Sequence, residues 1–123
     1  MRKFISLSAI LLSFSCLSAE VLECGLFKGF AGGTPIKTVK ANLENENIYA
    51  YETNQEERAS ISIVSQEGNF VRVRISQPED YNEVILDKGM LLSMKERDSF
   101  GLVINGAKET KMSAICYKGS APF

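Results

Sequence analysis

The sequence predicts an all-β protein: either a small antiparallel β-barrel of the up-and-down type, with about eight strands, or a β-sandwich, braced by one disulfide. Three observations predict this class. Apolar and polar residues alternate with a period of two over several short segments, turn-forming residues recur between those segments, and two cysteines stand near the ends of the expected domain. No sustained 3.6-residue apolar period follows residue 20, so no long helix is expected.

Residues 1–19 have the pattern of a cleavable secretory signal peptide. Two basic residues follow the first methionine, an apolar run relieved only by serines comes next, and Ala19 offers a small residue before the first acid. The run is short for a transmembrane helix, which needs about 20 apolar residues. We therefore expect residues 20–123 to form a single all-β domain that is exported, periplasmic or extracellular, with no transmembrane helix.

The cysteine count supports export. Cys16 lies in the predicted signal peptide, which leaves Cys24 and Cys116 near the two ends of the domain. Such a pair indicates a disulfide, because compartments outside the cytoplasm are oxidising. The bond would join the first strand to the last, as a closed barrel requires and a sandwich permits. A reactive thiol and a lipidated Cys16 are weaker alternatives, since the sequence has no histidine to activate a thiol and no clear lipoprotein pattern.

The alternation and the turns divide the domain into eight or nine short strands. One hairpin is expected at Gln66 to Asn69, between a strand with Ile61 and Ile63 and the strand that follows. Another is expected at Asn105-Gly106, because this dipeptide tolerates the positive φ of a tight turn. The expected strands are Val21–Phe27, Ile36–Leu43, Ile48–Glu52, Arg58–Gln66, Phe70–Gln77, Glu83–Leu86, Met90–Lys95, Phe100–Ile104 and Lys108–Tyr117.

The fifth expected strand carries the clearest register. Val71, Val73 and Ile75 should face the core, while Arg72 and Arg74 should face solvent. The two guanidinium groups on one face are candidates for binding an anion or an acidic partner. The alternation favours a simpler interpretation, an exposed sheet face on which arginine stems cover apolar surface.

Two further groups of residues are candidates for recognition. The segment Gly25–Pro35 combines four glycines with Phe27 and Phe30, which could contact a ligand. The favoured interpretation is a bulged strand followed by a broad turn, with both phenylalanines in the core. Four tyrosines could likewise form a recognition surface or close the ends of the core: Tyr49, Tyr51, Tyr81 and Tyr117.

The composition argues against catalysis. The absence of histidine excludes serine–histidine and cysteine–histidine arrangements and removes the commonest zinc ligand. The adjacent acids Glu56-Glu57 and Glu79-Asp80 lie beside expected turns, where carboxylates are normally solvated. We expect no catalytic residue, no metal site and no cofactor. A formal net charge of −1 gives no general attraction for nucleic acid.

These observations favour a non-enzymatic binding module that captures a small ligand or a protein partner in the cell envelope. The alternative is a structural or envelope-interaction protein without a small ligand, including an inhibitor of a cell-wall hydrolase. An outer-membrane barrel is a third interpretation, which the short strands and Pro122 disfavour. The candidate binding residues are Phe27, Phe30, Arg72 and Arg74.

Overall fold

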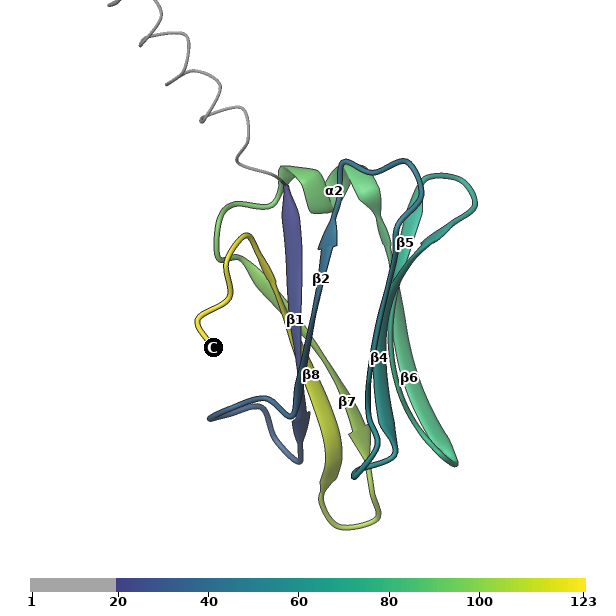
Figure 1. Cartoon of the computed structure of the whole chain (residues 1–123), viewed down its shortest axis with the longest axis vertical. Helices are drawn as coiled ribbons and strands as arrows, with labels where there is room; N and C mark the ends of the chain where they lie inside the picture. The colour runs from purple at the N-terminus through teal and green to yellow at the C-terminus, as the bar shows by residue number, and fades with distance from the viewer. Residues whose placement is uncertain (1–19) are drawn as a thin grey trace, which may run out of the picture.

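The computed structural model describes residues 20–123 as two four-stranded antiparallel sheets that pack face to face (Figure 1). Sheet A has the strand order β2-β1-β8-β7, and sheet B has the order β3-β4-β5-β6. The elements are β1 (Val21–Lys28), β2 (Lys37–Asn42), β3 (Tyr49–Asn54), β4 (Ala59–Gln66), β5 (Phe70–Gln77), β6 (Asp80–Asp87), α2 (Lys88–Ser93), β7 (Ser99–Asn105) and β8 (Thr110–Lys118). The predicted all-β class is confirmed, whereas the predicted signal peptide lies outside the described residues.

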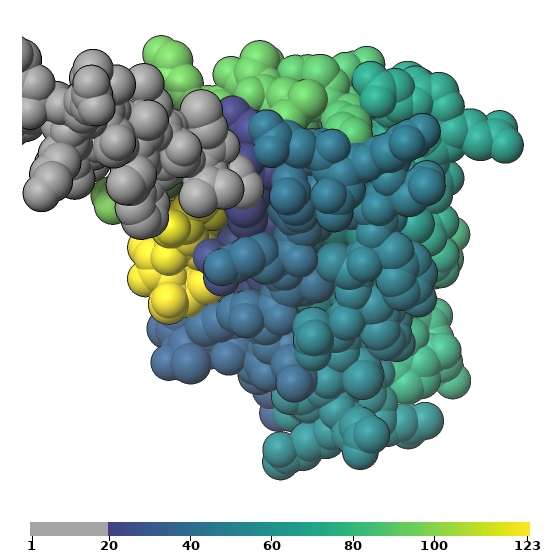
Figure 2. Space-filling model, turned by 45° about the horizontal axis from the view of Figure 1, so that its top comes forward, coloured from purple at the N-terminus to yellow at the C-terminus, as the bar shows by residue number. Residues whose placement is uncertain are grey.

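The molecule is a sandwich and not a closed barrel, because side chains instead of a backbone ladder join the sheets at their edges. At the β2–β3 edge, the Asn54 amide donates to the Ile36 carbonyl at 3.3 Å, and Lys37 lies 3.6 Å from Glu52. At the β6–β7 edge, the Asn82 amide donates to a backbone carbonyl of β7 at 2.8 Å. In Figure 2 the segments that contain β2 and β3 lie side by side on one face of the molecule.

The core lies between the sheets, and the expected register of the central hairpin is confirmed. Val71, Val73 and Ile75 are fully buried, and they face Ser65, Ile63 and Ile61 of β4 in the pairing. The intervening arginines of β5 point to the outer face of sheet B and are half-buried. Burial of alternate β-branched side chains fixes the register, because a one-residue slip would carry all of them into solvent.

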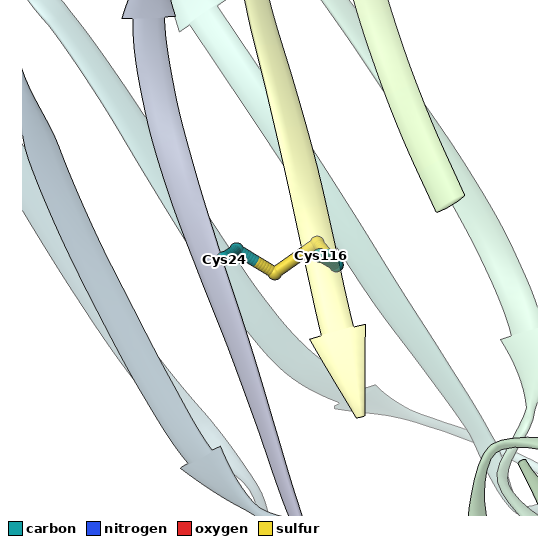
Figure 3. The surroundings of a disulfide bond; sticks show 2 residues. All are labelled: Cys24 and Cys116. Atoms are coloured by element: carbon teal, nitrogen blue, oxygen red, sulfur yellow. A yellow bond between two sulfur atoms is a disulfide. The ribbon is translucent and has the colours of Figure 1, made fainter. Parts of the chain in front are cut away.

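A disulfide joins β1 to β8 in the centre of sheet A (Figure 3). Cys24 and Cys116 are directly opposite each other in the pairing of the two strands, and both are fully buried. Leu22 and Leu26 point inward with Cys24, as their spacing predicted. The first and last strands of the domain are therefore neighbours, and the bond between them belongs to the core.

The strand expected at Met90–Lys95 is wrong, because this segment begins within the helix α2. The Asp87 side chain caps the helix by accepting hydrogen bonds from the backbone N–H groups of Gly89, at 2.8 Å, and Met90, at 3.3 Å. An aspartate at this position satisfies backbone donors that the first turn of a helix leaves unpaired. The helix lies across one end of the sandwich, where Leu91 closes the core (Figure 1).

A buried lysine fastens α2 to sheet A. Lys118, at the end of β8, is only 3% exposed. Its ammonium group donates to the carbonyls of Leu91 and Leu92 at 2.8 Å and to that of Met94 at 3.2 Å. The Glu20 carboxylate lies 2.7 Å from the same nitrogen and supplies the counter-charge. The cation thus satisfies the carbonyls at the C-terminal end of the helix, which no residue within the helix can pair.

Two connections between strands differ in length from those that the expected strand bounds and turns imply. The turn before β6 consists of Pro78-Glu79 alone, so β6 begins at Asp80 instead of Glu83. The Asn105-Gly106 pair does not form a tight two-residue turn, and neither residue has a positive φ. Instead the loop between β7 and β8 has four residues, and the Gly106 N–H donates to the Glu109 carbonyl at 2.7 Å.

Between residues 20 and 123, no helix is long and apolar enough to cross a membrane.

The disulfide should contribute a large part of the stability. It closes a loop with a sequence separation of 92, which the chain-entropy treatment converts to about 4–5 kcal/mol. Cys24→Ser and Cys116→Ser should each lower the free energy of unfolding by kilocalories, and the double variant should be little worse than either. Urea unfolding followed by circular dichroism measures this, and single variants as stable as the parent would contradict it.

The Lys118 ammonium group should also be needed for stability. Lys118→Met keeps most of the side-chain volume but removes the ammonium donor from the carbonyls at the end of α2 and the counter-charge from the Glu20 carboxylate. Of these carbonyls, only that of Leu91 keeps a backbone donor within residues 20–123, the Met94 N–H at 3.3 Å. We expect a loss of about 2–3 kcal/mol in the free energy of unfolding. Lys108→Met, at an exposed lysine in the β7–β8 loop, is the matched control and should change stability by less than about 0.5 kcal/mol. Equal stability of the two variants would refute this role.

Candidate functional site

The outer face of sheet B carries aromatic and arginine side chains with no other element of residues 20–123 packed over it (Figure 1). We call this surface the Tyr–Arg face. It is formed by Tyr49, Tyr51, Arg72, Arg74, Tyr81 and Ile85.

The pairing of the strands places these side chains in cross-strand rows. In one row Tyr49, Val64, Arg72 and Ile85 follow one another from β3 to β6. In the next row Tyr51 stands at the β3 end, and Arg74 lies beside Glu83. Because neighbouring strands lie about 4.8 Å apart, side chains in one row contact each other or a shared partner. The face therefore combines apolar surface and positive charge on a rigid support.

Exposure of the large side chains is high for a sheet surface. Tyr49 is 78% exposed, Tyr81 59% and Ile85 52%. An isolated exposed apolar residue is ordinary, but several on one face of one sheet are typical of an interaction surface. Tyrosine and arginine are also the residues most enriched where proteins bind one another.

The two arginines of this face have different surroundings. The Arg74 guanidinium lies 3.6 Å from the Glu83 carboxylate and 4.1 Å from the centre of the Tyr81 ring. No acid of residues 20–123 lies within ion-pair distance of Arg72. The Nε atom of Arg72 is also shielded from solvent and has no hydrogen-bond acceptor in this part of the chain.

An open groove of about 630 Å³ continues from the β3 side of the face. Tyr49 and Tyr51 form one wall, and Thr38 and Lys40 of β2 form the other, with Glu23 at its base. Most groups lining the groove are polar. It widens the surface that a partner could contact, and it does not enclose a small molecule.

The outer face of sheet A differs because the segment after β8 covers its centre. The Phe123 ring lies edge-to-face against Phe27 and Tyr117, with ring centres 5.7 and 5.6 Å apart. A Cβ atom on Gly25 would lie 2.8 Å from the tip of this ring, so the glycine provides the space that Phe123 occupies. The Ala121 N–H donates to the Glu23 carboxylate at 3.0 Å and holds the segment in place.

These contacts correct the interpretation of the glycine-rich segment. The β1 strand runs through Gly25 in continuous register with both neighbours, so the expected bulge is wrong. Phe27 is buried, but beneath Phe123 on the outer side of sheet A and not in the core between the sheets, where it was expected. Phe30 is not in the core: it is 76% exposed, in the loop between β1 and β2. That loop is the broad turn that the glycines predicted.

The structure therefore separates the predicted binding residues into two places. Arg72 and Arg74 share the Tyr–Arg face, as their alternation predicted. Phe27 and Phe30 belong to sheet A and its loop, so they do not form one site with the arginines. Cys24 and Cys116 are structural and fully buried.

The sequence pattern named Tyr81 as a candidate recognition residue but left it outside a strand, and it did not point to Ile85. In the structure Tyr81 belongs to β6 and points outward with Glu83 and Ile85. The alternation of residues 81–87 was the signal that could have extended the expected strand to Tyr81. Pro78 instead led to the first residues of β6 being assigned to a turn. The apolar Ile85 was not considered for the surface, because an isoleucine in an alternating strand normally points inward.

No cluster of three or more possible metal-ligating side chains occurs within residues 20–123. No known protein family, curated protein or solved structure matches this chain.

Proposed function

We propose that this protein is a non-enzymatic binding module that works outside the cytoplasm and recognises a protein partner through the Tyr–Arg face. The observation that carries the proposal is the exposure of three tyrosines and an isoleucine beside two half-buried arginines on the uncovered face of sheet B. Truncation of such residues commonly costs a large share of the binding free energy in protein complexes.

The shape of the surface favours a protein over a small ligand. Core side chains such as Leu26, Ile61 and Met112 pack in the space between the sheets and are fully buried. Small-ligand sites are usually concave and mostly apolar, whereas the groove beside β3 is open and polar. A broad face with aromatic side chains is suited to a partner surface of similar breadth.

The comparison of the two outer faces supports the same choice. The aromatic residues of sheet A contact one another and are covered by Phe123, whereas those of sheet B are exposed. Exposed aromatic surface carries a solubility cost for a monomer, and binding a partner removes that surface from water.

The location outside the cytoplasm is part of the proposal. The Cys24–Cys116 disulfide and the signal-peptide pattern of residues 1–19 support it, because disulfides persist in oxidising compartments.

The test is affinity capture from an envelope extract with the purified protein and two variants. The face variant is Tyr49→Ala/Tyr51→Ala, and the matched control is Val103→Ala, at an exposed position on the outer side of sheet A. We expect the face variant to bind the captured protein at least about tenfold more weakly, which corresponds to about 1.4 kcal/mol, with an unchanged melting temperature. The control should bind like the parent protein.

Several results would contradict the proposal. Equal capture by the parent, the face variant and the control would show that the partner does not use the Tyr–Arg face. A lipid and metabolite screen is run alongside. A small molecule that binds the protein, with no protein captured, would favour a small-ligand module in place of a protein-binding one. Turnover of a substrate by the purified protein would contradict the non-enzymatic role.

A further inference from the structure

Arg72 and Arg74 stand on the same strand and face, yet only one of them has its charge balanced by its neighbours. Arg74 is paired with Glu83 and lies over the Tyr81 ring. These two contacts balance the charge of the guanidinium group and cover one of its faces. A partner that approached Arg74 would have to compete with Glu83.

Arg72 lies in a different environment. Its cross-strand neighbours are Val64 on β4 and Ile85 on β6, both of them apolar. No carboxylate of residues 20–123 is within ion-pair distance, and its shielded Nε–H has no acceptor there. Buried donors in folded proteins are nearly always hydrogen-bonded, so an unpaired one calls for an explanation.

We propose that Arg72 is the receptor for a carboxylate on the protein partner, supplied by an aspartate or glutamate side chain. The inference rests on the proposed function and adds the chemistry of the central contact. A guanidinium group binds a carboxylate with two parallel hydrogen bonds, which fixes the orientation of the partner as well as its position. Reorientation of Arg72 toward that acceptor would also remove the unpaired Nε–H.

The surroundings of Arg72 would strengthen such a contact. Ile85 is exposed beside it, and Tyr49 stands at the β3 end of the same row. When a partner covers these side chains, water is excluded from the ion pair, and the lower local dielectric increases the attraction. Apolar residues around a polar contact have this role in many protein interfaces.

Because of the net charge of the chain, attraction for a carboxylate on a partner is confined to the surroundings of Arg72. The formal net charge is −1, so the protein has no overall positive field that would draw an acidic partner from a distance. Recognition of a carboxylate must therefore come from local contact at Arg72.

The experiment measures the Nε–H signals of the arginine side chains by NMR in the purified protein. The probe is a capped five-residue peptide with one glutamate between two phenylalanines, and the control peptide has glutamine in place of glutamate. We expect the glutamate peptide to shift the Arg72 signal more than those of Arg58, Arg74 and Arg97. Arg72→Gln should weaken its binding about tenfold or more, as the loss of a charged hydrogen bond implies. Arg97→Gln, at an exposed arginine in the loop before β7 and outside the Tyr–Arg face, is the matched control and should change the binding less than about threefold.

The outcomes separate this inference from the proposed function. If both peptides shift the tyrosine signals of the face equally and Arg72→Gln has no effect, the face binds without a carboxylate and the inference is wrong. If the Arg74 signal moves and the Arg72 signal does not, or if millimolar glutamate peptide leaves Arg72 unchanged, the inference is also wrong. The proposed function fails on a different result, namely partner capture that is unaffected by the tyrosine substitutions.

Discussion

The pairing of the first strand with the last is the constraint on which the rest of this structure depends. Sheet A consists of the hairpins β1–β2 and β7–β8, and only the β1–β8 pairing joins them. The Cys24–Cys116 bond crosses that pairing inside the core. Without the disulfide, only backbone hydrogen bonds and packing would hold the two hairpins together. Bringing together hairpins so far apart in the sequence costs chain entropy, because a long loop must close. Sheet B is a continuous meander and needs no such link.

Because of this pairing, the chain covers the outer face of sheet A and leaves the outer face of sheet B uncovered. The chain after β8 emerges beside β1, and its return across Gly25 places Phe123 on the outer side of sheet A. Nothing in residues 20–123 returns across sheet B, because β3 to β6 follow one another without a long connection. The uncovered face carries the exposed tyrosines, and the covered face uses its aromatic residues for internal packing. The division between a covered face and an uncovered face thus follows from the topology.

Strand alternation predicted the parts of the fold that depend on neighbouring residues alone. The period of two at Val71, Val73 and Ile75 gave the register correctly, since burying alternate β-branched residues needs no knowledge of distant elements. The helix α2 was missed because its apolar residues also suit a strand, and a single capping aspartate is a weak signal in a six-residue helix. The position of Phe123 over Gly25 could not be predicted, because residues so far apart in the sequence meet only in the folded chain. The candidate site was predictable only in part for the same reason. Alternation predicted that Arg72 and Arg74 share a face, but the side chains beside each arginine come from β4 and β6, which the sequence of β5 does not show.

We propose sheet B as the contact face. Site-specific photo-cross-linking in cells that produce the protein can show whether a partner touches it. A photo-reactive amino acid would replace Tyr51 or Ile85 on the Tyr–Arg face, or Val103 on the outer side of sheet A, all of them exposed positions. If sheet B is the contact face, the two sheet B positions should cross-link to the same protein, and the Val103 position should not. Cross-linking of that protein from Val103 alone, or equally from all three positions, would contradict it.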